Sequence, residues 1–266
     1  MKRGTRAAQH RRACRGCLRP YGVHHAHFSH HDMELAVQPL PETRAVLHEL
    51  ASLNSDGDHL LDHLQGVIDE VMRAIGDCVG VSIAFRDAGL TFSFVRTPDL
   101  GVLDAVQYVD DGPCVRAIED GEEHRVDDIL DEDRWQLYAQ TTAAQGVRSS
   151  LSMPMRSDGT IIGSVNLYAA STAAFLGEEQ ALARLFRADV EDTVNNADLS
   201  MSTLQTARQG PQQLTDAAVI DQAVGVLVAR HGISVAEAQQ RLSDSAYQAG
   251  ISEIEIAGAI VRSLQI

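Results

Sequence analysis

Five carboxylates stand close together in the segment DDILDEDRW, the densest group of chemically capable side chains in the sequence. They are Asp127, Asp128, Asp131, Glu132 and Asp133. Paired carboxylates can act as general acid and base or hold a divalent cation. Acidic residues also cap short helices in solvated loops. We favour the solvated loop over either kind of site.

A C-x-x-C pair near the N-terminus has the residue types of a zinc site. Cys14 and Cys17 are followed by three histidines, His24, His25 and His27. Thiolate and imidazole are zinc ligands, but a structural site needs four ligands in a folded segment. No second, properly spaced ligand pair follows, and the stretch lacks apolar periodicity. We therefore predict a disordered basic, His-rich tail over 1–40 and no metal site.

Cys114 follows Gly112 and Pro113 at the expected start of a helix, where the helix dipole lowers a thiol pKa. We interpret this cysteine as a small buried apolar residue rather than a redox thiol. The sequence contains no G-x-S-x-G, H-E-x-x-H, P-loop or G-x-G-x-x-G motif. It therefore predicts no catalytic residue, no cofactor and no enzymatic activity.

Charge is divided unevenly along the 266 residues. Residues 1–31 hold seven basic and no acidic side chains, so residues 32–266 carry 15 basic against 37 acidic ones, a net charge of −22. A body this acidic repels polyanions at long range, so contact with nucleic acid would need a local patch. Whether residues 1–32 are translated, or translation begins at Met33, stays open.

The sequence shows neither a membrane-spanning segment nor a secretory signal. No run approaches the roughly 18 apolar residues of a membrane helix. No apolar segment follows the basic N-terminus as in a secretory signal, and four cysteines are too few for a disulfide framework. We expect a cytoplasmic protein without a membrane partner.

Strand and helix patterns alternate through the first two hundred residues. Two pairs of alternating strands are separated by turn residues: 81–85 with 90–94, and 150–155 with 160–169. Helices are predicted over 42–76 with a break at NSDGD, from Pro113 onward, and over 134–145. Hairpins with helices before, between and after them indicate an α+β domain.

The C-terminal part is predicted to be helical. A three- and four-residue spacing over 177–207 indicates a stalk helix that pairs with its own copy, and GPQQ at 210–213 marks a linker. After it, Thr215 and two capping boxes, Ser234 to Glu237 and Ser252 to Glu255, each begin a helix. Glycines end the first two of these helices. The last fifty residues therefore form a three-helix module.

The segment 103–175 resembles a GAF domain of the actinobacterial type. The resemblance rests on Gln107-Tyr108, Gly112-Pro113-Cys114, Asp133-Arg134-Trp135, Gly146-Val147-Arg148, Pro154, Gly163, Asn166-Leu167-Tyr168 and Phe175. With its flanking elements it covers about 45–200. It implies an antiparallel sheet flanked by helices and a role in ligand sensing or dimerisation.

A small-molecule ligand of this domain would lie against inward strand residues. The candidates are Ile83, Phe85, Met153 and Asn166. Asn166 is the most informative, because a polar side chain on an apolar strand needs a partner if it is buried. That partner is either structural or a ligand, and we favour the structural one.

The segment 212–266 resembles an ANTAR domain, an all-α three-helix RNA-binding antiterminator module. The resemblance rests on Ile220 to Leu227, Glu237-Ala238, Leu242, Glu255-Ile256-Ala257 and Ile260-Val261. It implies a homodimer that binds paired RNA stem-loops and prevents transcription termination. An α+β GAF domain followed by this module is the fold that we predict.

The predicted RNA-binding residues lie on all three helices of the module. They are Ala223, Gly225, Arg230, Arg241, Tyr247 and Arg262. The arginines would bind phosphates, and Tyr247 would stack on an unpaired base. Gly225 costs about 1 kcal/mol against alanine in a helix, so we expect a close approach by another helix or by RNA.

The module also departs from the family pattern. Val224 stands where many members have lysine. Residues 212–266 contain three arginines and six acidic residues, a net charge of −3. Our main hypothesis is a cytoplasmic, dimeric, signal-responsive antitermination regulator. The alternative is a dimerisation scaffold with a degenerate module that no longer binds RNA.

Overall fold

The computed structural model describes residues 37–53, 60–86, 89–157, 159–186 and 217–264. A six-stranded antiparallel sheet lies at its centre, in the order β1-β3-β2-β6-β5-β4. The strands are β1 (Gln38–Pro39), β2 (Cys78–Phe85), β3 (Leu90–Val95), β4 (His124–Val126), β5 (Ser149–Ser157) and β6 (Thr160–Ala169). Both predicted hairpins are present, as β2 with β3 and β5 with β6. Pairing of β2 with β6 joins them, with Ser82 opposite Asn166.

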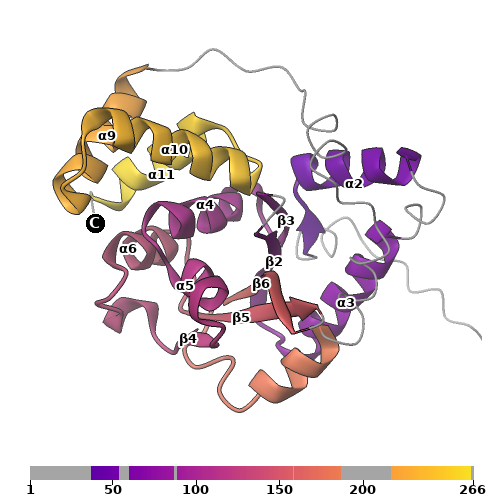
Figure 1. Cartoon of the computed structure of the whole chain (residues 1–266). Helices are drawn as coiled ribbons and strands as arrows, with labels where there is room; N and C mark the ends of the chain where they lie inside the picture. Colours follow the sequence, from indigo (N-terminus) through magenta and orange to yellow (C-terminus); the bar gives the residue numbers. More distant parts are fainter. Residues whose placement is uncertain (1–36, 54–59, 87–88, 158, 187–216, 265–266) are drawn as a thin grey trace, which may run out of the picture.

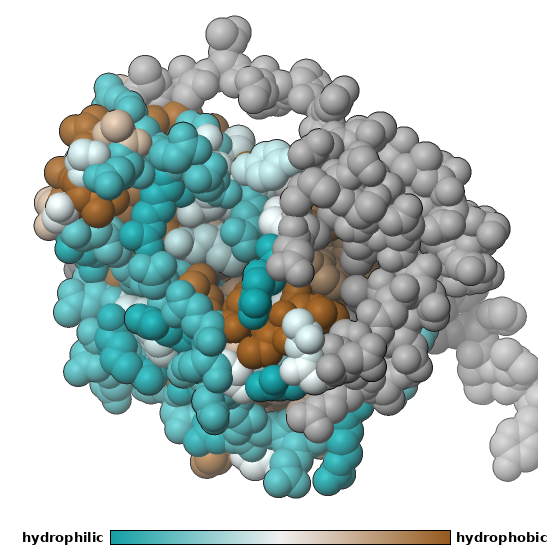
Figure 2. Space-filling model, viewed as in Figure 1, coloured by the Kyte–Doolittle hydropathy of each residue, from teal (hydrophilic) through white to brown (hydrophobic). Residues whose placement is uncertain are grey.

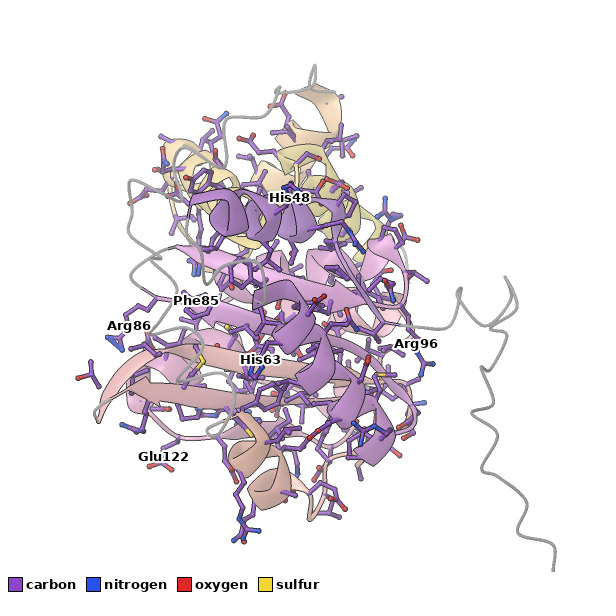
Figure 3. The ribbon with its side chains drawn as sticks, turned by 90° about the vertical axis from the view of Figure 1, so that its right-hand side faces the viewer. His48, His63, Phe85, Arg86, Arg96 and Glu122 are labelled. Atoms are coloured by element: carbon purple, nitrogen blue, oxygen red, sulfur yellow. The ribbon has the colours of Figure 1, made fainter. Side chains whose placement is uncertain are left out.

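One face of the sheet is apolar. Helices α2 (Pro41–Leu53) and α3 (Leu60–Ala74) and a helical segment at 179–186 cover it. Seen from this side, α3 with His63 lies in front of the strands, and α2 with His48 lies above it (Figure 3). The core beneath them is built from alternate strand residues, such as Ile83, Phe92 and Leu167. This alternation is the period-two pattern of a strand with one face in a hydrophobic core.

The opposite face of the sheet is polar, although it is equally buried. Its side chains include Ser82, Thr91, Ser93, Ser150, Ser164 and Asn166. Helices α4 (Val102–Val109), α5 (Pro113–Asp120) and α6 (Gln136–Ala144) cover it, with short 3-10 turns at Pro98–Gly101 and Ile129–Asp131 (Figure 1). Buried polar groups require hydrogen-bond partners, and these helices supply them.

The last three helices form a separate layer outside α4 and α6. They are α9 (Ala217–His231), α10 (Val235–Ala249) and α11 (Glu253–Ser263). Both predicted capping boxes are present, at Ser234 with Glu237 and at Ser252 with Glu255. Gly232 and Gly250 have positive φ angles where α9 and α10 end, the conformation that glycine adopts at low cost.

This C-terminal module packs directly on the sheet domain. Helix α10 contacts α4 and β3, and α11 contacts α6 and α4 (Figure 1). A single hydrophobic cluster runs from Val106 of α4 into Leu242 of α10 and Ile260 of α11. The two parts of the chain therefore share one core across the layer boundary.

Several predictions fall outside the described residues. These are the N-terminal tail, the GPQQ linker, and the stalk helix beyond residue 186. Within the described part, no single helix is long and apolar enough to cross a membrane. The pair 218–231 and 235–249 passes the same test only when taken together, and it bends by 111°.

Candidate nucleic-acid interface and sensor site

Two of the three arginines proposed to bind phosphates are held by the sheet domain. Arg241 forms an ion pair with Asp111, with a distance of 2.5 Å between Nη2 and Oδ2. Arg230 donates a hydrogen bond from Nη2 to Oε1 of Gln140 on α6, at 3.1 Å. Both contacts cross the boundary between the C-terminal module and the sheet domain. Neither partner is predictable from sequence, since Gln140 lies 90 residues before Arg230 and Asp111 lies 130 residues before Arg241.

A third polar contact lies beside these two. Nε2 of His231 is 3.6 Å from Oδ1 of Asp110. Burial lowers the pKa of the His231 ring and raises the pKa of the Asp110 carboxyl. Because its pKa is lowered, the His231 ring is neutral at pH 7. Of these three contacts between the module and the sheet domain, only the one between Arg241 and Asp111 is an ion pair. Asp110 also accepts a hydrogen bond from the backbone N–H of Tyr138, which ties the end of α4 to α6.

The other predicted RNA-binding residues lie apart from these contacts. Arg262 is exposed, and Tyr247 is 53% exposed. Ala223 is fully buried in the module core, so its side chain is covered in this conformation. Gly225 is exposed, and no described atom lies within 4 Å of where its Cβ would be. The six residues therefore do not share one surface in this structure.

Helix α4 is buried along its whole length, because it lies between the sheet and the C-terminal helices. Its polar residues Asp104, Gln107 and Tyr108 are spaced three and four apart and lie on one face, toward the sheet. The opposite face carries Val102, Ala105, Val106 and Val109. A surface helix usually places its apolar stripe inward. Here the stripe points outward, and the C-terminal module covers it.

The polar face of α4 centres on Asp104, which is only 1% exposed. Its carboxylate accepts hydrogen bonds from Ser82 Oγ (2.5 Å), Ser93 Oγ (2.7 Å) and the Tyr168 hydroxyl (2.8 Å). Nε2 of Gln107 donates to the Tyr168 oxygen at 2.6 Å. Burial raises the pKa of Asp104, and hydrogen bonding by the three hydroxyls and by Asn166 acts in the opposite direction.

Asn166 extends this cluster along β6. Its Nδ2 donates to Ser82 Oγ at 3.1 Å, so Asn166 has the structural partner that the sequence analysis favoured. Its Oδ1 is buried and has no hydrogen-bond partner among the described residues. The other three predicted ligand-binding residues, Ile83, Phe85 and Met153, lie in the core on the opposite face of the sheet. The four residues therefore do not line a common pocket.

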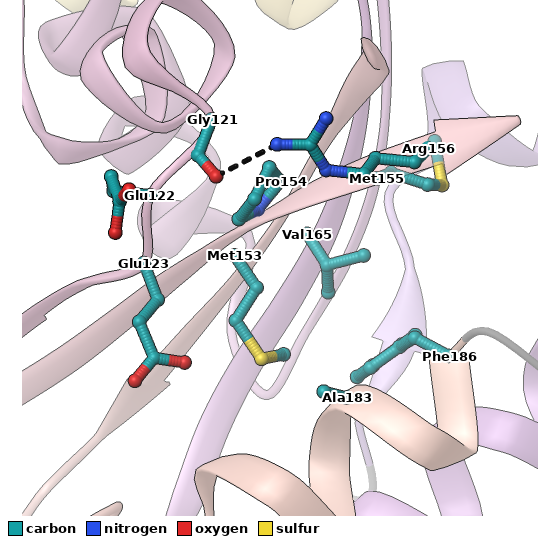
Figure 4. Close-up of a pocket in the computed structure, with 10 residues that line it drawn as sticks. All are labelled: Gly121, Glu122, Glu123, Met153, Pro154, Met155, Arg156, Val165, Ala183 and Phe186. Atoms are coloured by element: carbon teal, nitrogen blue, oxygen red, sulfur yellow. Dashed lines mark hydrogen bonds between the residues drawn. The ribbon is translucent and has the colours of Figure 1, made fainter. Parts of the chain in front are cut away.

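Met153 lines a different hollow, at the edge of the sheet (Figure 4). Its volume is about 300 Å³, and its floor is formed by Met153, Met155, Val165 and Phe186. Glu122 and Glu123 lie on one rim, and Arg156 donates a hydrogen bond to the Gly121 carbonyl at 3.0 Å. The hollow borders residue 186, where the described helix ends.

Comparison with known families identifies both parts of the chain. A GAF domain model matches residues 60–195, about half of the chain, and an ANTAR domain model matches residues 209–261. The chain belongs to the GAF and ANTAR domain regulators. None of the curated proteins compared with the chain matches it. The GAF match covers strands β2 to β6 with helices α3 to α6, and the ANTAR match covers α9, α10 and most of α11.

Four of the residues that carried the GAF resemblance, Gln107, Cys114, Asn166 and Tyr168, belong to the buried polar cluster around Asp104. Cys114 donates its backbone N–H to Oε1 of Gln107 at 2.7 Å, and its Sγ lies 3.0 Å from Ser164 Oγ. Burial raises the pKa of the Cys114 thiol to about 12. A thiol with so high a pKa is not a reactive nucleophile at neutral pH. Cys114 is therefore a buried structural residue, as the sequence analysis proposed.

The acidic segment of the GAF domain makes local contacts. Asp128 accepts a hydrogen bond from the Leu130 backbone N–H and forms an ion pair with Arg148. Glu132 forms an ion pair with Arg134. Within the described part of the chain, no group of three or more His, Cys, Asp or Glu side chains could hold a metal ion. Asp128 thus caps a short helical turn, and Asp128 and Glu132 form surface ion pairs.

Replacing Gly225 by alanine is expected to stabilise the ANTAR module by about 1 kcal/mol, because alanine is the better helix former and its methyl group meets nothing here. Urea unfolding of both proteins measures this difference. Hydrophobic residues gather over α9 in Figure 2, and Val226 beside Gly225 is half-buried. If the variant is instead less stable, or if it no longer sediments as a dimer, a second helix must approach Gly225.

Proposed function

We propose that this chain is a cytoplasmic, signal-responsive regulator of transcription antitermination. The ANTAR module binds RNA stem-loops as a dimer, and the GAF domain senses a small molecule and controls whether the module is available. The described conformation is the docked, low-affinity form. The ANTAR family match supports the RNA-binding role, and the GAF match supports the sensing role.

The contacts of Arg230 and Arg241 carry this proposal. Both arginines are candidates for phosphate binding, and both are held by GAF side chains, Gln140 and Asp111. An arginine paired with a carboxylate cannot bind a phosphate with the same guanidinium edge. The GAF domain therefore competes with RNA for the same side chains.

A filter-binding assay tests the function. The full-length chain is titrated with a two-stem-loop RNA at several salt concentrations. Binding through arginines releases counterions, so the affinity should fall with a log–log slope of about −2 or steeper. A slope near zero, or no binding in any condition, would favour the rival function, a dimerisation scaffold. The acidic surface of the module is the feature that favours this rival.

A further inference from the structure

The hollow at the edge of the sheet has an apolar floor that lies deep in the protein (Figure 4). Met153 and Met155 of β5 are each 5% exposed, and Phe186 of the helical segment 179–186 is 4% exposed. These side chains therefore lie at the bottom of a recess and not on a surface patch. The volume of about 300 Å³ is at the lower end of the range for ligand pockets, about 300 to 1,000 Å³. An occupant of this recess is a small molecule with an apolar part.

Three charged side chains border the apolar floor. Glu122 and Glu123 lie between α5 and β4, and Arg156 lies on β5. Figure 4 shows the two glutamates on one side of the floor and the helical segment on the other. Among the residues that the structure describes, no side chain forms an ion pair with any of the three. The recess therefore offers both a positive and a negative group to a ligand.

Arg156 is held at the rim by the end of α5. Its Nη2 donates a hydrogen bond to the Gly121 carbonyl at 3.0 Å. Gly121 ends α5 with a φ of 72°, and a Cβ at this position would collide with the guanidinium of Arg156. Glycine at this position thus allows the guanidinium to approach the backbone closely. A guanidinium has five N–H donors, so the bond to Gly121 leaves others for a carboxylate.

We propose that this recess binds an α-amino acid with an apolar side chain. The apolar side chain packs on Met153, Met155 and Phe186. The ammonium group pairs with the glutamates at the rim, and the carboxylate pairs with Arg156. A simple amine leaves Arg156 without a partner, and a carboxylic acid leaves the glutamates without one. This inference rests on the proposed sensing role of the GAF domain and names the site and the chemical class that it senses.

The same ligand contacts the segment by which the chain leaves the GAF domain. Ala183 and Phe186 line the recess and belong to 179–186, the last described residues before α9. Arg125 of β4 forms an ion pair with Glu179 at the start of this segment. A bound amino acid adds apolar contacts near its other end. Ligand binding therefore stabilises the packing of this segment on the sheet, at a point that precedes the ANTAR helices in the chain.

Thermal unfolding of the full-length chain tests the site without RNA. The probes are L-leucine, L-methionine and L-phenylalanine. The controls, at equal concentration and ionic strength, are glycine, isopentylamine and isocaproate, which lack the apolar side chain, the carboxylate and the ammonium group of leucine, respectively. At least one probe should raise Tm by about 4 °C at ten times its Kd, and the controls should not. If no probe raises Tm up to its solubility limit, or a control raises it equally, the proposal is wrong.

A variant that fills the recess locates the binding. Ala183→Leu places a larger side chain in the recess from the helical side and should remove the shift. Ala181→Leu is the matched control, because Ala181 is exposed on the same segment and does not line the recess. This control should keep the shift. A shift that survives in Ala183→Leu overturns the assignment.

Charge variants test how the amino acid is held. Glu122→Gln/Glu123→Gln should weaken binding at least tenfold, because the ammonium group loses its charged partners. Glu42→Gln/Glu70→Gln removes two exposed carboxylates outside the recess and should leave the Kd unchanged. An unchanged Kd in the first variant contradicts the proposal. Both pairs alter exposed side chains only, so they decide the matter if Ala183→Leu fails to fold.

Hydrogen exchange tests the contact with the helical segment. Bound amino acid should slow the exchange of backbone amides in 179–186, and unchanged exchange there would contradict the contact with Ala183 and Phe186. None of these readouts depends on RNA. A positive thermal shift with no RNA binding would disprove the RNA function and leave the amino-acid site intact. RNA binding without any thermal shift would disprove the site and leave the RNA function intact.

Discussion

Replacing both Asp111 and Ile251 by asparagine is expected to raise the affinity of the full-length chain for RNA about thirtyfold. Asp111 holds Arg241, and Ile251 packs against Gly101 at the start of α4. A surface ion pair contributes up to about 1 kcal/mol, and a half-buried isoleucine contributes about the same. Losing about 2 kcal/mol of docking free energy raises the undocked population about thirtyfold, and the apparent affinity follows that population.

A single charge change elsewhere controls for electrostatics. The double variant removes one negative charge from the GAF domain, and Asp131→Asn removes one from an exposed position outside the docking contacts. Filter binding should show a clear gain only for the double variant. Equal gains in both proteins would mean that the GAF domain repels RNA through its charge and does not mask the module.

Replacing Arg230, Arg241 and Arg262 by alanine is expected to weaken RNA binding at least a hundredfold. Each charge-assisted hydrogen bond contributes about 1.5 kcal/mol or more, and each lost phosphate contact makes the log–log salt slope shallower by about 0.7 for single-stranded regions. The log–log salt slope should therefore become less negative by about 2. Both quantities come from one filter-binding series at four salt concentrations.

The triple variant requires a protein in which docking is already weak. Arg230 and Arg241 also stabilise docking, so the substitutions are made in the Asp111→Asn/Ile251→Asn protein, where docking is already weakened. The matched control replaces Arg73, Arg86 and Arg116 of the GAF domain by alanine, with the same change in net charge. A parallel loss in this control would mean that RNA binds through overall charge and not through the ANTAR arginines.

Local signals predicted most of the elements. The hairpins follow from strict alternation over 81–85 and 90–94, and the ANTAR helices follow from capping residues such as Ser234 and Ser252. These signals reside in neighbouring residues, so they are readable without tertiary structure. The two shortest strands, β1 and β4, escaped prediction because two or three residues carry no periodicity.

Helix α4 was the element of most consequence that sequence analysis missed. Its residues alternate between a polar face and an apolar face, but the polar face of Asp104 and Gln107 points into the protein. The apolar face is covered by helices more than a hundred residues later in the chain. No local rule predicts which face of a helix a distant segment will cover.

The same limit applies to the candidate sites. Asn166 was correctly singled out as a buried polar side chain that needs a partner, whereas Asp104 was overlooked because acidic residues in a sequence are normally exposed. The strand residues Ile83, Phe85 and Met153 were grouped with Asn166 as inward-facing. Strand register places them on the other face, since each step of one residue reverses the side of the sheet.

The outward-facing valines of α4 also bear on whether each domain of this chain can fold alone. The family matches divide the chain between residues 195 and 209, yet the hydrophobic cluster of Val106 and Leu242 continues across that division. A GAF fragment cut at the division would present a bare stripe of valine to water. Burial of the apolar face of α4 therefore requires both domains in one chain. A GAF fragment alone would expose an apolar surface on which a second chain can aggregate.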